Sequence, residues 1–100
     1  MDFYKLNISH HFEWDKWNTD KIRDKHKVEY FECEEVFFDD GKVILKDVLH
    51  SGNEERYILI GKTKKDKLLF IVFTIRNEKI RVVSARPTNK KEARLYEKAP

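Results

Sequence analysis

Four arginines lie in or beside strand-like runs in the second half of the chain: Arg56, Arg76, Arg81 and Arg86. A guanidinium group keeps its charge and offers a planar fork of donors. It can therefore bind a phosphate and also stabilise a pentavalent phosphorane. In an antiparallel arrangement the first three should approach one another at one edge of the sheet. Arg86 should lie about 17 Å further along its strand, at ~3.4 Å per residue.

A second basic group is expected around Arg86. Ser84 faces the same side of its strand as Arg86, and it either donates to a phosphate or fills the strand. The basic residues expected near Arg86 come from the turn before the third strand and from the last helix; they are Lys62, Lys64, Lys65, Lys90, Lys91 and Arg94. Alternatively, the arginines are solvated strand ends that pair with Glu54, Glu55 or Glu78. We expect the set to bind an anion, because cations gathered without matching carboxylates cost free energy.

Three side chains are candidates for moving a proton. His26 ends the first predicted helix, where it either acts as general acid or base on a ribose 2′-OH or a 5′ leaving oxygen, or caps the helix dipole. Glu92 and Tyr96 lie four residues apart and share a face of the last helix. Glu92 is either a catalytic base or part of a capping box with Asn89. Tyr96 either stacks on a nucleobase or packs the helix.

The familiar signatures of other enzyme classes are missing. The sequence has no glycine-rich phosphate loop, no nucleophile elbow and no cluster of metal ligands. The tandem pair His10–His11 would point to opposite faces of a strand, which argues against a shared metal site. Cys33 is expected to be buried on its helix. Chemistry must then come from Arg, His, Glu and Tyr with no metal or cofactor, which favours RNA cleavage because the 2′-OH is a built-in nucleophile.

The composition indicates one domain with an asymmetric charge. One hundred residues can fill one core, so we expect a single domain over residues 1–100. The charged share of 39% exceeds the usual quarter. Residues 1–50 carry 8 Lys/Arg against 12 Asp/Glu, whereas residues 51–100 carry 13 against 6. The basic second half points to a polyanion or an acidic partner.

Two classes of protein are argued against by the sequence. A lone cysteine cannot form an intramolecular disulfide, so a secreted, disulfide-stapled scaffold is not expected. No apolar run is long enough to span a bilayer, and the start MDFYKLNISHHFEWD lacks a signal-peptide pattern. We expect a cytoplasmic protein without a membrane partner.

The hydrophobic pattern predicts two helices in the first half. Part of residues 3–14 is expected to form a strand before them. Asp15 is the predicted N-cap of a helix over KWNTDKIRDKHK, with Trp17 and Ile22 on a narrow apolar stripe. A second amphipathic helix is expected from Glu29 to the turn at 39–41.

Four strand-like runs follow: KVILKDVL, ERYILIGK, KLLFIVFTIR and KIRVVSAR. Their short polar connections make an antiparallel meander the simplest topology. LLFIVF is apolar at every position and should be a central strand covered on both faces. The capping box at residues 89–92 predicts a last helix through about residue 98. The expected fold is α+β in the order β-α-α-β-β-β-β-α, an antiparallel meander sheet flanked by two N-terminal helices and one C-terminal helix.

Seven segments follow one another along about residues 12–97: FEWD, a helix ending in KH, EEVFFDD, ERYILIG, LLFIVFTIR, IRVVSAR and KKEARLYE. In this order they resemble the BrnT family of toxins. The resemblance implies a RelE-like fold and a small ribonuclease of a type II toxin–antitoxin system, which inhibits translation by cleaving RNA. It also implies a cognate ribbon-helix-helix antitoxin, in a hetero-oligomer that binds operator DNA.

The resemblance also implies roles for single residues. Family motif positions fall on the four arginines and on Asp15, His26, Glu92 and Tyr96. The residues expected to be catalytic are Arg56, Arg76, Arg86, His26, Glu92 and Tyr96. Those expected to bind RNA are Arg81, Ser84, Lys62, Lys90, Lys91 and Arg94. This sequence departs from the family pattern at Lys27, where glycine is usual, at Ile22, where asparagine is usual, and in residues 1–11, which extend the typical start.

Two other functions are compatible with the same residues. One is a non-catalytic interaction module whose basic surface binds an acidic partner or nucleic acid. The other is an RNA-binding domain with strongly salt-dependent affinity and no cleavage. Expression discriminates the first from a ribonuclease, because a ribonuclease arrests the growth of its host unless the partner is present.

Overall fold

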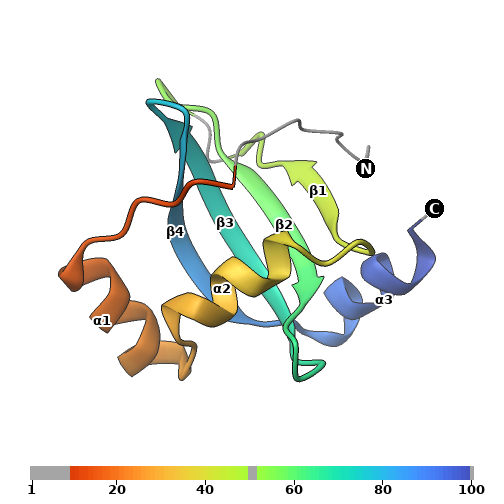
Figure 1. The fold of residues 1–100 in the computed structure, drawn as a ribbon. Helices are drawn as coiled ribbons and strands as arrows, with labels where there is room; N and C mark the ends of the chain where they lie inside the picture. Colours follow the sequence, from red (N-terminus) through yellow and green to blue (C-terminus); the bar gives the residue numbers. More distant parts are fainter. Residues whose placement is uncertain (1–9, 50–51, 100) are drawn as a thin grey trace.

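The computed structural model describes residues 10–49 and 52–99. Its elements, in chain order, are α1 (Lys16–His26), α2 (Tyr30–Phe37), β1 (Val43–Lys46), β2 (Tyr57–Lys62), β3 (Leu68–Arg76), β4 (Lys79–Pro87) and α3 (Lys90–Lys98). The strands pair antiparallel in the order β1-β2-β3-β4 (Figure 1), so each strand neighbours the next one along the chain. This confirms the predicted α+β meander with two helices before the sheet and one after it.

The strand expected within residues 3–14 is replaced, in the part that the structure describes, by a single parallel bridge between Phe12 and Ile80. The Glu13 N–H donates to the Ile80 carbonyl at 2.9 Å, and the Ile80 N–H donates to the His11 carbonyl at 2.7 Å. The remainder of the prediction, residues 3–9, lies outside the described residues. The bridge satisfies backbone groups on the outer edge of β4, which would otherwise be left to pair with another chain.

One face of the sheet packs against α1 and α2 and forms the core. Alternate positions of the strands supply it, as expected for a period of two. Its buried members are Ile22, Val28, Cys33, Val36, Phe37, Ile44, Leu59, Leu69, Ile71, Phe73, Ile80, Val82 and Ala85. The rings of Phe37 and Phe73 meet edge to face, with centroids 5.0 Å apart. Gly61 lets α2 approach β2 closely, because a Cβ there would lie 3.0 Å from the Val36 carbonyl oxygen.

The opposite face is covered over only part of its width. Val43, Leu45 and Ile60 are buried there, close to α3. Further along the sheet, Phe70 and Val72 of β3 are only half-buried. The prediction that β3 is covered on both faces is therefore only partly right. The physical reason is the size of α3, which has nine residues, none of them buried.

The helix caps follow the predicted signals. The Asp15 carboxylate accepts from the Asn18 N–H at 2.8 Å, and Asn89 and Glu92 form the capping box of α3. At the other end of α1, Lys27 has a left-handed backbone with φ of 58°, a conformation that glycine adopts at lower cost. None of the helices in the described part of the chain is long and apolar enough to cross a bilayer.

Trp17 departs from the prediction for α1. It was expected on the apolar stripe, but its surface is 72% exposed. The side chains of α1 that are buried are Ile22 and Asn18. The helix lies beside β4, the edge strand (Figure 1), so only a narrow strip of it meets the core.

Candidate nucleic-acid interface

A β-bulge in β4 decides which side chains share the second face of the sheet. Val72 of β3 pairs with Ser84, but the next residue, Phe73, pairs with Val82, so Val83 is an extra residue in β4. In a regular strand with the same number of residues, residues 81 and 86 would point to opposite faces, because they are five positions apart. With the bulge, both point to the face away from α2. Cross-strand partners share a face, and the partners of Arg81 and Arg86, at 74 and 70, are four apart on β3.

We call this surface the arginine face; it carries Arg56, Thr74, Arg76, Arg81, Ser84 and Arg86. It contains all four arginines singled out in the sequence and the serine beside the last of them. The cross-strand pairs of Arg81 and Arg86 form two rows across the sheet. Counted along β3, from residue 74 to residue 70, these rows are four residues apart, or about 14 Å at ~3.4 Å per residue. The four arginines therefore lie on one continuous surface, but in two groups.

The first group surrounds a small pocket. Arg56, Arg76 and Arg81 line a cavity of about 210 Å³, and Thr74 is also part of its lining. The β3–β4 register places Thr74 directly beside Arg81. A small side chain between long ones leaves the hollow. Thr74 is 1% exposed, and its hydroxyl donates to the Glu55 carbonyl at 2.8 Å. The predicted approach of these three arginines is confirmed.

Carboxylates pair with several of these arginines, contrary to expectation. Arg76 makes two hydrogen bonds of 2.9 Å to Glu54, and Arg81 reaches Glu13 at 3.0 Å and Asp15 at 2.8 Å. The argument that the cations lack matching carboxylates was therefore wrong. The acidic first half of the chain supplies two of these partners, Glu13 and Asp15, at positions that the local sequence pattern does not connect to β4.

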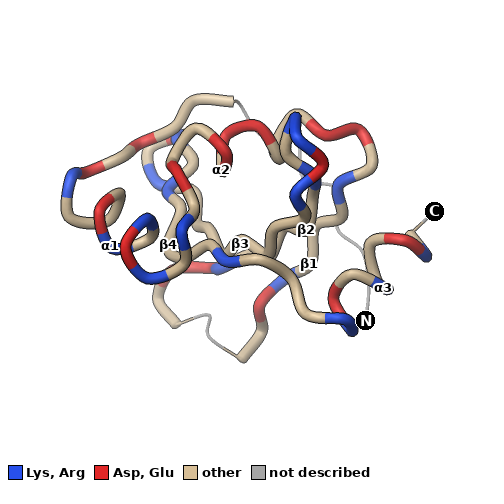
Figure 2. Tube along the Cα trace, turned by 90° about the horizontal axis from the view of Figure 1, so that it is seen from below, with Lys and Arg blue, Asp and Glu red and all other residues tan. Residues whose placement is uncertain are grey.

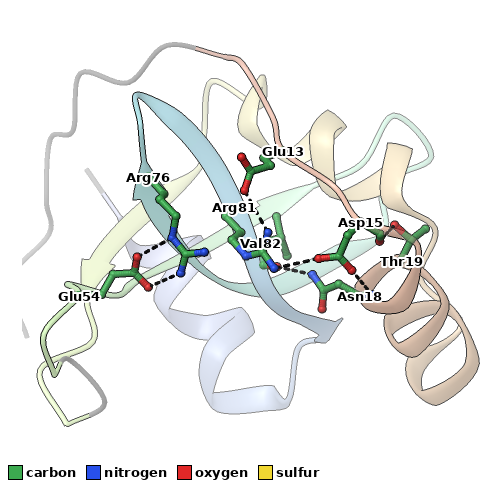
Figure 3. A network of polar contacts seen from close by, with 8 residues as sticks. All are labelled: Glu13, Asp15, Asn18, Thr19, Glu54, Arg76, Arg81 and Val82. Atoms are coloured by element: carbon green, nitrogen blue, oxygen red, sulfur yellow. Dashed lines mark hydrogen bonds and ion pairs between the residues drawn. The ribbon is translucent and has the colours of Figure 1, made fainter.

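The N-terminus of α1 holds this part of the site in place. Figure 3 shows Asp15 between two partners: it caps Asn18 and accepts from Arg81. The Asn18 side chain donates to the carbonyl of Val82, the residue before the bulge, at 2.6 Å. The pKa of Asp15 is lowered, mainly by the Asn18 N–H and further by Arg81. Asn18 was not among the predicted site residues. The sequence signal that could have identified it is its place as a polar residue on the buried face of α1, where its side chain needs a hydrogen-bond partner.

The second group is centred on Arg86. Its guanidinium lies 4.3 Å from the centre of the Phe70 ring and makes hydrogen bonds of 2.8 and 2.7 Å to the two carboxylate oxygens of Glu92. Glu92 also accepts from the Asn89 N–H at 2.9 Å. Partial burial acts to raise the pKa of Glu92, but these hydrogen bonds outweigh it and the pKa lies below its ordinary value. Glu92 is thus an ionised anchor that orients Arg86.

His26 has the protonation state that a general base needs. Its pKa is lowered, first by burial and then by the charges of Lys25, Arg86 and Lys21. The imidazole is therefore neutral at neutral pH. The α1 helix lies beside β4 (Figure 1), and Asp15 at its N-terminus bonds Arg81.

Tyr96 and Lys62 lie on the α3 side, away from the pocket of the three arginines. The Tyr96 hydroxyl donates to Asp39 at 2.7 Å, and burial with this hydrogen bond raises its pKa to about 12. The Lys62 ammonium lies 5.7 Å from the centre of the Tyr96 ring. Together they tie α3 to the end of β2 and the loop after α2.

The basic residues of α3 border a second hollow on the same side of the sheet. Lys91 and Arg94 line a cavity of about 530 Å³ whose floor includes Leu45, Ile58 and Phe70. Lys90 is exposed on the first turn. Phe70 thus touches Arg86 and borders this cavity as well, so the basic residues of α3 lie next to the second arginine group.

The opposite side of the molecule has another character. Figure 2 shows acidic residues and no Lys or Arg along α2. A larger cavity of about 800 Å³ lies there, lined by Phe31 and Phe38 and by five carboxylates, Glu34, Glu35, Asp39, Asp40 and Asp66, with Lys62 and Lys64. The excess of negative charge in this cavity disfavours a phosphate. Although it is larger than the two cavities beside the arginines, it is therefore not the candidate site for nucleic acid.

Comparison with known families decides what kind of protein carries this site. Residues 14–92 match the family described as ribonuclease toxin, BrnT, of type II toxin–antitoxin systems. The chain belongs to this family. The match includes α1, the bulge, the four arginines and Glu92, and it stops before Tyr96. No match is found among curated proteins.

Membership of the BrnT family gives the chain a chemical context. It is a ribonuclease toxin of a type II toxin–antitoxin system, with RNA as substrate and a cognate antitoxin as partner. The RelE-like relationship stays a prediction from the resemblance. The roles of the individual site residues stay predictions as well.

Proposed function

We propose that this BrnT-family toxin is a metal-independent endoribonuclease whose RNA lies along the arginine face. The observation that carries the proposal is the bulge at Val83, which puts two groups of arginines on one surface. A strand of RNA contacting both groups would follow β4, with α1 alongside it. Its phosphates would meet Arg81 at one end and Arg86 at the other.

Cleavage takes place at the Arg86 end. The neutral imidazole of His26 takes the proton of the ribose 2′-OH, and the 2′ oxygen attacks the adjacent phosphorus. The bond from phosphorus to the 5′ oxygen breaks, and that oxygen takes a proton from water. The products are a 2′,3′-cyclic phosphate and a 5′-hydroxyl. Arg86, oriented by Glu92, stabilises the charge of the phosphorane.

Glu92 and Tyr96 then serve the reaction through position. Glu92 holds the guanidinium of Arg86 through two hydrogen bonds, and its ionised state makes it a weak base. Tyr96 keeps its proton because its pKa is about 12, and it anchors α3 through Asp39. His26 remains the proton acceptor in this arrangement.

The pocket of Arg56, Arg76 and Arg81 binds a phosphate further along the RNA. The anion competes there with Glu54 for Arg76. Both side chains of that pair are more than a third exposed, and an exposed ion pair contributes little in water. The phosphate can therefore replace the carboxylate at small cost. Ser84, between the two groups, donates to the RNA backbone, and Lys62, Lys90, Lys91 and Arg94 add positive charge on the α3 side.

Metal independence is supported by the side chains available. Within residues 10–49 and 52–99, no three His, Cys, Asp or Glu side chains come together as a possible metal site. The experiment is cleavage of a defined single-stranded RNA in EDTA by the purified toxin. Variants Arg86→Ala and His26→Ala test the site, and Glu97→Ala, an exposed residue of α3 outside the lining of the cavity beside Phe70, is the control.

Cleavage that persists in EDTA, leaves a 2′,3′-cyclic end, and is lost in Arg86→Ala and His26→Ala but not in Glu97→Ala is the expected result. A substrate with one 2′-deoxy ribose at the cut should resist cleavage there. Cleavage that stops with EDTA and returns with a divalent metal would contradict metal independence. Full activity of both site variants would move the site elsewhere. No cleavage at all, with or without ribosomes, would favour the interaction module.

We further propose that the antitoxin is a ribbon-helix-helix protein, that the pair forms a hetero-oligomer which binds operator DNA, and that the toxin acts in the cytoplasm. The resemblance of the motifs supports this. Co-expression with the neighbouring open reading frame, followed by size-exclusion chromatography and operator binding, is the test. A stable complex without DNA affinity, or a partner of another fold, would contradict it.

A further inference from the structure

Trp17 lies in an unusual place for so large an apolar side chain. It is 72% exposed, yet it borders the pocket of Arg56, Arg76 and Arg81. The ammonium of Lys21, one turn further along α1, lies 5.2 Å from the centre of its ring. A flat aromatic surface thus stands at the rim of a cationic hollow.

This combination matches what single-stranded nucleic acids require. Their bases stack on aromatic side chains while lysine and arginine hold the phosphates. Trp17 contributes nothing visible to the core, whose α1 member is Ile22. Its exposure therefore has a cost in solubility that the fold does not explain.

We propose that Trp17 is a stacking platform for one nucleobase of a single-stranded RNA, two or more nucleotides away from the cleaved bond. The proposal rests on the function proposed above. The phosphate next to that base occupies the pocket of the three arginines, and Lys21 adds charge beside the ring. The separation of about 14 Å between the two arginine rows places Trp17 beyond reach of the scissile group. Trp17 is thus a positioning residue that anchors the RNA.

The surroundings favour nucleic acid over a protein partner at this position. The other exposed aromatics of the described chain include Phe31 and Phe38 of the α2 side, and they line a cavity with Glu34 and Glu35. Trp17 instead has three arginines and a lysine around it, and these outnumber the three carboxylates that pair with Arg76 and Arg81, which are Glu54, Glu13 and Asp15. The cationic setting suits a phosphate-bearing ligand.

The test is binding of a short single-stranded oligonucleotide with 2′-O-methyl riboses, which cannot be cleaved. Wild type, Trp17→Ala, Trp17→Phe and, as matched control, Phe31→Ala are compared by fluorescence anisotropy. A second oligonucleotide of the same length has one abasic position, moved along the strand. We expect Trp17→Ala to weaken binding roughly 5- to 150-fold, as for loss of one stacked base. Trp17→Phe should restore most of it, and Phe31→Ala should bind as wild type does.

The abasic series isolates stacking from charge. When the missing base is the one that stacks on Trp17, wild type should bind the abasic oligonucleotide as weakly as Trp17→Ala binds the intact one. Trp17→Ala should bind the intact and the abasic oligonucleotide equally well. In cleavage assays Trp17→Ala should raise KM and leave kcat unchanged, and a dinucleotide substrate should not sense the change. Equal affinity of wild type and Trp17→Ala for the intact oligonucleotide overturns the proposal, as does a variant that weakens only the antitoxin complex. Because the oligonucleotide cannot be cleaved, failure of the proposed catalysis would leave this result readable.

Discussion

Arg81 and Arg86 point to the same face of β4 although they are five positions apart, because Val83 is bulged out between them. A regular strand would direct one of the two into the core. The side chain of Asn18, bonded to the Val82 carbonyl at 2.6 Å, holds the strand where the bulge begins. With this odd spacing, the arginine face therefore depends on the bulge and on the helix that fastens the strand beside it.

Deletion of Val83 should preserve the arginine face. It leaves Arg81 and Arg86 four positions apart, as their partners at 74 and 70 are on β3, so a regular strand directs both side chains to the same face. We expect the free energy of unfolding and RNA cleavage to stay close to their wild-type values. Val83→Ala, which keeps the chain length, is the control. Urea unfolding and the cleavage assay measure the outcome; a deletion variant that unfolds at much lower urea and loses cleavage would contradict the assignment of Val83 as the extra residue.

Asn18 should be more sensitive than its neighbours on α1. Asn18→Ala removes a buried donor and leaves the Val82 carbonyl unpaired, at about 1–3 kcal/mol of stability. Asn18→Asp should be worse, because a carboxylate oxygen would then face the carbonyl oxygen. Thr19→Ala, which loses an exposed hydrogen bond to the Asp15 carbonyl, is the control. The midpoints of denaturant unfolding give the order of stability of the three variants. An Asn18→Asp variant at least as stable as Asn18→Ala would count against the hydrogen bond between Asn18 and the Val82 carbonyl.

The Arg86–Glu92 pair should make stability depend on acid pH. The pKa of Glu92 in the folded chain is below its ordinary value of 4.5. Its contribution is therefore present above about pH 4.5 and is lost as the pH falls through the folded pKa. Glu92→Gln should cost about 1 kcal/mol at neutral pH, allowing for the partial exposure of Arg86. The gap between wild type and variant should close as unfolding is measured at lower pH. A gap that stays constant down to pH 3 would exclude this origin.

His26 should give the pH–rate profile an acid limb below pH 6.5. Cleavage by a neutral imidazole rises with pH through its pKa, which is lowered from 6.5, so the rate should be level near pH 7. Removing His26 should reduce kcat by roughly 10²- to 10⁴-fold. Lys25→Ala removes one of the charges that lower this pKa, so the acid limb should move to higher pH. An acid limb that does not respond to Lys25→Ala would point to another titrating group.

The elements of this protein follow from local sequence. Strand-like apolar runs and turn residues predict β2, β3 and β4, and the Asp15 and Asn89 caps mark the starts of α1 and α3. Short connections leave the meander as the simplest topology. These features are set by neighbours within a few residues, so they can be read without the fold. The approach of Arg56, Arg76 and Arg81 follows from the meander alone.

Tertiary structure decides the rest of the site. No local pattern marks the bulge at Val83. The bulge is needed because Ile80 and Val82, which precede it, and Ala85, which follows it, are all buried on the same face of the sheet. The ion pairs of Arg81 join residues 66 and 68 positions apart, and no periodicity connects them. Trp17 is apolar in the sequence but exposed in the fold, because α1 lies at the sheet edge and buries only a narrow strip. Local propensity determines the strands and helices, whereas packing between distant segments determines which charged and aromatic groups meet.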